Sequence, residues 1–185
     1  GIALFAAYIV SAEVQRYSSL SQLHTLASVS PKISAVVNEL QGERGVSATY
    51  LSSGGSGVWS RRLEEQFAST DAVLTEILPF LQKFPAASYG VQVEERLTAA
   101  LAEFEKLESF RKRTQTARTT IEATAEYYTQ TIRQLLDIAS LVSSLADDAE
   151  IKSQSIAYMS LLEIKERAGL ERAMGAKGYG AKAFD

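Results

Sequence analysis

Residues 111–122 read Arg111-Lys-Arg-Thr-Gln-Thr-Ala-Arg118-Thr-Thr-Ile-Glu122, and this stretch decides how the helices of the chain are arranged. Residues 111–118 carry no apolar anchor for a turn and a half of helix. Thr119 and Glu122 then have the spacing of a capping box, in which the two side chains satisfy free N–H groups at the start of a helix. We therefore predict that one helix ends near residue 113 and that another begins near residue 120.

Apolar residues recur at helical spacing on both sides of this break. The clearest loop is Ser52-Ser-Gly-Gly-Ser-Gly57, and Ser30-Pro31 either caps a new helix or kinks one long helix. No segment reads as a strand. The expected helices cover residues 11–29 and 31–51, which form one kinked helix or two, and then residues 58–84, 90–113, 120–146 and 148–182. The predicted fold is all-α, an up-and-down antiparallel helical bundle of four to five long helices.

The composition is that of an ordinary globular domain and offers little for catalysis. The chain has 185 residues, 46% of them hydrophobic and 22% charged, and its net charge of −3 predicts no attraction to nucleic acid. Arg61-Arg62 and Arg111-Lys-Arg113 are short and flanked by acidic residues, so we interpret them as solvated faces. There is no cysteine, and the single histidine, His24, stands apart from the other candidate residues. We expect no enzyme activity within this chain, no cofactor and no metal.

The first residues suggest a membrane anchor. Residues 2–10 form an uncharged apolar run that is too short to cross a bilayer, which takes about 20 residues. We interpret residues 1–10 as the end of a transmembrane helix; the alternative is the apolar first turns of a soluble helix. Residues 11–185 are then a helical sensor domain. The helical pattern continues to Asp185 without a stop signal, so we expect the domain to be truncated at its C-terminal end.

Arg44 interrupts the apolar stripe of the helix predicted over 31–51. A buried guanidinium needs an anion or a set of acceptors, and Glu43 points about 100° away around the helix. Ser47 and Ala48 follow on the same face, one a hydroxyl donor and the other small. This combination indicates an anion pocket. Two alternatives stay open: Arg44 extends outward along its apolar stem, or it pairs with a carboxylate from another helix.

The last predicted helix carries a second arginine, Arg172, on its stripe or at the border of it. Gly169 lies one turn earlier, and its small size would allow a ligand or another helix to approach closely. With the break at 114–119, the last helix runs parallel to the first. Arg44 and Arg172 are then separated by no more than roughly 10 Å along the bundle axis. Without the break, the two arginines could not share a ligand.

These residues also carry a resemblance to a known family. The segment Leu40-Gln-Gly-Glu-Arg-Gly-Val-Ser-Ala-Thr-Tyr-Leu-Ser-Ser-Gly-Gly55, with Phe67-x-x-Thr-Asp71 and Leu162-x-x-Lys-Glu-x-x-Gly-Leu-Glu-Arg-Ala173, resembles the nitrate- and nitrite-sensing (NIT) domain. This resemblance covers about residues 30–185. It implies a helical sensor of bacterial receptors in which Arg44 and Arg172 bind the anion. Members of that family usually continue with further helices.

The sequence therefore predicts a ligand-sensing domain of a bacterial signal-transduction receptor. Nitrate or nitrite would bind between helices through Arg44 and Arg172, with Ser47 and Gly169 beside them, and would change the offset of the first and last helices. We expect a homodimer at the inner membrane, with a periplasmic sensor and an adjacent transmembrane helix that receives the signal. An output module outside this chain could be enzymatic. The alternatives are a four-helix chemoreceptor-type sensor of another small ligand and a purely structural dimerisation bundle.

Overall fold

A computed structural model describes residues 28–55, 57–145, 153, 156–158, 160–169 and 171. Within these residues the chain forms helices and no strand, which confirms the predicted all-α class. The helices are a first helix over 28–52, α2 (Gly57–Lys83), the short 3-10 helix η1 (Ala86–Tyr89), α3 (Val91–Gln115), α4 (Ile121–Ser144) and a last helix over 160–169. Residues 1–10 and Arg172 lie outside the described residues.

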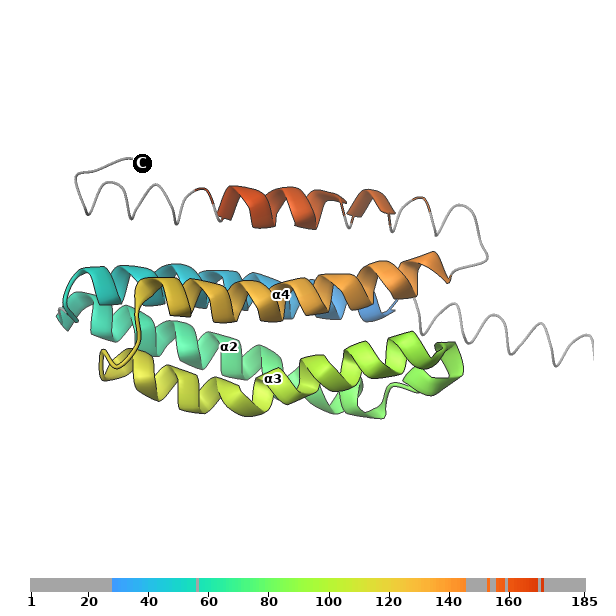
Figure 1. Cartoon of the computed structure of the whole chain (residues 1–185), viewed down its shortest axis with the longest axis horizontal. Helices are drawn as coiled ribbons and strands as arrows, with labels where there is room; N and C mark the ends of the chain where they lie inside the picture. The colour runs from blue at the N-terminus through green and yellow to red at the C-terminus, as the bar shows by residue number, and fades with distance from the viewer. Residues whose placement is uncertain are drawn as a thin grey trace, which may run out of the picture.

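The long helices lie along a common axis and alternate in direction from the first helix to the last (Figure 1). The last helix consequently runs in the same direction as the first, as the predicted break before α4 requires. Ser30 and Pro31 lie within the first helix, which is helical without interruption from 28 to 52. No helix within the described residues is long and apolar enough to cross a bilayer.

The break between α3 and α4 is built by the backbone as well as by a cap. Ala117 adopts φ 51°, the left-handed region, and the Arg118 N–H donates to the Arg113 carbonyl at 2.8 Å, which ends α3 in a Schellman arrangement. Thr120 then caps α4, since its hydroxyl accepts from the Ala123 N–H at 3.1 Å. The predicted break is confirmed, but the predicted cap at Thr119 is wrong by one residue.

The Gly-rich loop after the first helix uses glycine where the backbone needs it. Gly54 and Gly55 have φ of 68° and 76°, and the Gly55 N–H donates to the Tyr50 carbonyl at 3.0 Å. Side chains with a Cβ rarely adopt this conformation, so the two glycines allow the sharp reversal into α2. The predicted loop is confirmed.

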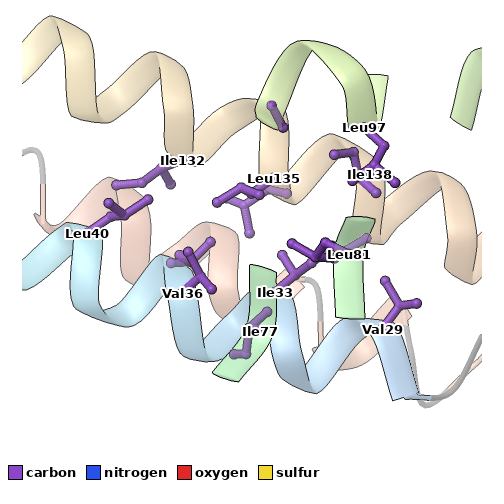
Figure 2. Close-up of a cluster of buried hydrophobic side chains, with 14 of the residues drawn as sticks. Val29, Ile33, Val36, Leu40, Ile77, Leu81, Leu97, Ile132, Leu135 and Ile138 are labelled. Atoms are coloured by element: carbon purple, nitrogen blue, oxygen red, sulfur yellow. The ribbon is translucent and has the colours of Figure 1, made fainter. Parts of the chain in front are cut away.

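Apolar side chains pack in the interior of the bundle, and Figure 2 shows part of this cluster. The side chains in this cluster come from every long helix, including Leu162 of the last helix. Figure 2 labels Val29, Ile33, Val36, Leu40, Ile77, Leu81, Leu97, Ile132, Leu135 and Ile138. Further along the first helix the apolar stripe gives way to buried polar residues, namely Glu43, Arg44 and Ser47. Along this helix face an apolar stretch is thus followed by a buried polar one.

Candidate anion-binding site

Arg44 lies in the interior of the bundle, with a relative exposure of 2%. Its Nη1 donates to Glu166 Oε1 at 2.6 Å and to the Thr129 hydroxyl at 2.9 Å, and its Nη2 donates to Glu166 Oε2 at 3.1 Å. The guanidinium therefore holds a carboxylate with both of its terminal nitrogens, a geometry that also suits other planar anions. Of the open alternatives, outward extension is excluded, and pairing with a carboxylate of another helix is what the structure contains.

Glu166 joins the last helix to the first. Besides its two bonds from Arg44, its Oε2 accepts from Gln41 Nε2 at 2.8 Å. Lys165, the preceding residue, donates to the side-chain oxygen of Asn38. A carboxylate with only 7% of its side chain exposed is costly to bury, so these donors are what make its position stable. Glu166 was not among the predicted site residues. Its position one turn before Gly169, on the same helix face, makes it a candidate, but nothing within its own helix indicates that it meets Arg44.

Gly169 packs directly against Arg44. A Cβ added at Gly169 would lie 3.0 Å from Arg44 Nη2, which is closer than ordinary contact. The structure thus brings together Arg44 and Gly169, two residues that the sequence predicted for one site. The glycine permits the guanidinium to lie against the backbone of the last helix, and the same contact leaves no space for a further group between them.

Ser47 lies one turn beyond Arg44 and is completely buried. Its hydroxyl has no hydrogen-bond partner of good geometry within the described residues, although it lies near enough to the Tyr128 hydroxyl to lower the pKa of that phenol. A buried hydroxyl without a well-aligned partner costs free energy, which makes Ser47 a candidate donor for a ligand. The prediction that Ser47 contributes to the ligand site stays a prediction.

Glu43 points away from Arg44, as predicted, yet it is also fully buried. Its carboxylate accepts from Arg111 Nε at 2.7 Å, from Arg111 Nη2 at 2.8 Å and from the Tyr128 hydroxyl at 2.6 Å. Arg111 also donates to Asp71 at 2.6 Å and stacks on the Phe67 ring. We call Glu43, Arg111, Tyr128 and Asp71 the Glu43 network. It ties the first helix to α2, α3 and α4.

The interpretation of Arg111 as part of a solvated face is therefore wrong. Only 11% of its side chain is exposed, because α3 turns it inward toward the acceptors of the Glu43 network. Burial opposes its charge, but the hydrogen bonds and charges of Glu43 and Asp71 outweigh that effect and raise the pKa of the guanidinium. Burial is the main cause that raises the pKa of Tyr128, and the Glu43 charge adds to it.

An open groove of about 290 Å³ runs between α4 and the last helix. Two arginines and three acidic residues contribute to its lining, and the Glu166 side chain forms part of its wall. The lining residues are Arg133, Leu136, Asp137, Glu163, Glu166 and Arg167. Glu166 therefore faces Arg44 on one side and a solvent-filled groove with two further arginines on the other. Within the described residues no cluster of acidic or histidine side chains is arranged to hold a metal.

Comparison with known proteins identifies the family of the chain. The family described as NIT, nitrate and nitrite sensing, matches residues 35–185, a range that contains Arg44, Glu166 and Gly169. The chain belongs to the NIT family. The fold is similar to that of the NasR transcription antiterminator structure over 97% of this chain and 48% of that one, with a TM-score of 0.86 and 29% identity.

A curated relative supports the same assignment. The NIT chain is 32% identical over 166 residues to the nitrate regulatory protein of Klebsiella oxytoca, a match that covers 88% of this chain and 41% of that protein. The chain thus spans less than half the length of either relative. Both relatives are regulators by name, and neither is described as a membrane receptor or a chemoreceptor.

Proposed function

We propose that this NIT domain binds nitrate or nitrite at Arg44 and reports the anion by displacement of the last helix. The observation that carries the proposal is the buried fork of Arg44, which holds a planar carboxylate through two nitrogens. Nitrate is planar, has acceptor oxygens on every side and donates no proton. A guanidinium fork is the side chain best matched to such an anion.

Further residues would complete the site. Ser47 offers a buried hydroxyl one turn from Arg44. Arg172 follows Gly169 by three residues, so a continued helical spacing would put both on one face. The close contact of Gly169 with Arg44 means that an anion between them would have to push the last helix away. We therefore propose that Arg44 and Arg172 together bind the anion, and that the bound anion displaces the last helix.

Calorimetry of the chain with nitrate, nitrite and chloride tests the ligand. We expect heat of binding with nitrate or nitrite and none with chloride, and loss of that heat in Arg44→Lys and in Arg172→Ala. Arg61→Ala is the matched control, since Arg61 makes an exposed ion pair with Glu65 within α2, away from Arg44 and the groove. Equal results with all three anions would contradict the proposal, and binding that survives in Arg172→Ala would remove Arg172 from it.

The setting of the domain is a separate proposal. We propose a bacterial receptor anchored at the inner membrane through the segment at residues 1–10, with a periplasmic sensor and a homodimeric assembly. The two relatives, a nitrate regulatory protein and a transcription antiterminator, offer no support for the membrane setting. Membrane fractionation of the protein in its native host tests it. Recovery in the soluble fraction would favour a regulator of the kind that those names describe.

A structural bundle is the second candidate function, because one of its expectations is met. That alternative predicted arginines paired with carboxylates, and Arg44 is paired with Glu166. It also predicted no pocket between the first and last helices, and the groove beside Glu166 is lined from α4 and the last helix. A chain that binds no anion in calorimetry but dimerises in analytical ultracentrifugation would favour this candidate.

A further inference from the structure

The carboxylate of Glu166 occupies the place that an anionic ligand of Arg44 would need. It takes both terminal nitrogens of Arg44 and the Gln41 amide, at distances between 2.6 and 3.1 Å. Within the described residues these are the donors best placed to receive a planar anion at this point. An incoming anion therefore meets a site that is already filled from within the chain.

We propose that Glu166 is a resident anion that the ligand displaces from Arg44, and that the freed carboxylate turns into the groove beside Arg133 and Arg167. The proposal rests on the proposed function and adds the event that regulates the same site. It names Glu166 as the residue that sets ligand affinity, and Arg133 and Arg167 as its partners in the bound state.

Charge balance favours an exchange over simple addition. Arg44 is buried, and a buried guanidinium that loses its anion is strongly destabilised. A ligand that arrives with one negative charge restores the pair, and it leaves Glu166 as the group that needs a new environment. An anion added without the departure of Glu166 would place two negative charges against one arginine, with Gly169 closing the space.

The groove supplies that new environment. Glu166 already lines it, and so do the side chains of Arg133 on α4 and Arg167 on the last helix, both of them exposed. A carboxylate that turns outward therefore enters water and meets two guanidinium groups. Asp137, the acidic neighbour on α4, is held by Arg96 at 2.7 Å and competes less for them.

The exchange would loosen the last helix. Among the described residues of that helix only Leu162 and Glu166 are buried, while Leu161 and Ile164 are exposed on its outer side. Release of Glu166 removes one of these two anchors together with its bonds to Arg44 and Gln41. The last helix then keeps Leu162 and the contact of Lys165 with Asn38.

Titration with sodium nitrate, followed by calorimetry, tests the exchange on the chain as it is. Glu166→Gln keeps the shape of the side chain but removes its charge, so we expect nitrate to bind about ten- to a hundredfold more tightly, a typical range for coupled sites. Glu105→Gln removes an equal charge from an exposed site on α3 and should leave affinity unchanged. If Glu166→Gln binds nitrate no more tightly than the parent chain does, the exchange is wrong while the proposed function stands. If neither binds, the proposed function itself fails.

A second variant tests the exchange in the parent chain, where the folding of Glu166→Gln does not matter. Arg133→Gln/Arg167→Gln removes the receiving partners, and we expect nitrate affinity to fall about tenfold in the parent chain. The same pair of changes should have no effect when Glu166→Gln is also present, because no carboxylate then needs the groove. A loss of equal size in both backgrounds would mean that the two arginines merely attract anions, and it would overturn the exchange. Unchanged affinity in the parent chain would overturn it as well.

Discussion

Arg44 and Glu166 lie 122 positions apart in the sequence and meet in a buried ion pair, with Arg44 Nη1 2.6 Å from Glu166 Oε1. The two partners differ in what surrounds them. Arg44 has bundle on every side, whereas Glu166 borders a groove that is open to solvent. This asymmetry decides what each partner does when the other is removed.

Loss of Glu166 should destabilise the fold more than loss of Arg44. Glu166→Met leaves a buried guanidinium without an anion, at a cost of about 3–5 kcal/mol in unfolding free energy. Arg44→Met frees a carboxylate that can turn into the groove, so its cost should be smaller. Urea denaturation of both variants and of the double Met variant measures the difference. Equal losses would show that Glu166 is as confined as Arg44.

The hydroxyl of Tyr128 should contribute more stability than the hydroxyl of its neighbour. Tyr128 donates to the Glu43 carboxylate at 2.6 Å, whereas Tyr127 donates to the Glu103 backbone carbonyl at 2.9 Å. A bond to a charged acceptor is worth about 1.5–3 kcal/mol and a neutral one about 0.5–1.5 kcal/mol. We expect Tyr128→Phe to lower the free energy of unfolding by more than Tyr127→Phe does. The reverse order would contradict the role given to the Glu43 network.

Alkaline pH should weaken the fold through the same tyrosines. Burial raises the pKa of Tyr128 and of Tyr127 above the ordinary value of 10.0, and nearby carboxylates add to the effect. The unfolded chain therefore loses these protons first, so stability is intact below pH 10 and falls as the pH rises above it. The loss for each tyrosine should steepen from about 0.7 kcal/mol per pH unit at pH 10 toward about 1.4 kcal/mol per pH unit at higher pH. Urea midpoints between pH 8 and 11 measure the fall, and Tyr128→Phe should make it less steep.

Ala117 should be replaceable by glycine with a gain in stability. Its φ of 51° is unfavourable for a residue with a Cβ, by about 1–2 kcal/mol. We expect Ala117→Gly to raise the free energy of unfolding by about 1 kcal/mol, reduced by the greater freedom of glycine in the unfolded chain. Ala102→Gly, on the exposed side of α3, should instead lower it by about 0.5–1 kcal/mol. Chemical denaturation of the pair separates the two effects.

Gly169 should be needed for ligand binding rather than for folding. Gly169→Ala places a Cβ 3.0 Å from Arg44 Nη2, so the guanidinium must shift by a few tenths of an ångström. We expect weaker nitrate binding, because the fork no longer lies at its present position. Gly45→Ala is the control, since its Cβ would meet nothing within 4 Å. A Gly169→Ala variant that binds as tightly as Gly45→Ala would remove Gly169 from the site.

Much of the fold was predictable because it depends on local signals. Helical spacing and Pro85 locate α2 to within one residue of its observed ends. The end of α3 lies two residues later than predicted, since Thr114 remains buried in the helix and the Schellman turn comes after it. The Thr119 cap was wrong because two adjacent threonines offer the same chemistry, and only the tertiary fold selects Thr120.

The partners of the site residues were not predictable. The position of Arg44 on an apolar stripe indicates burial, but no periodicity within one helix reveals which carboxylate it meets. Arg111 shows the same limit: a basic run flanked by acids resembles a solvated face until α3 is packed against Asp71 and Glu43. Ion pairs between helices depend on how each helix is rotated about its axis and shifted along it relative to its neighbours. The local sequence of one helix does not determine either quantity.

The adjacent residues Glu43 and Arg44 connect the first helix to different parts of the bundle. Glu43 is bonded to Arg111 of α3 and to Tyr128 of α4, and Arg111 in turn is bonded to Asp71 of α2, so a slide or rotation of the first helix would break the two bonds of Glu43. Arg44 reaches the last helix, in which Leu162 and Glu166 are the buried residues among those that the structure describes. If a bound anion displaces the last helix, as we propose, the displacement starts at Arg44 and moves the C-terminal side of the bundle relative to the first helix.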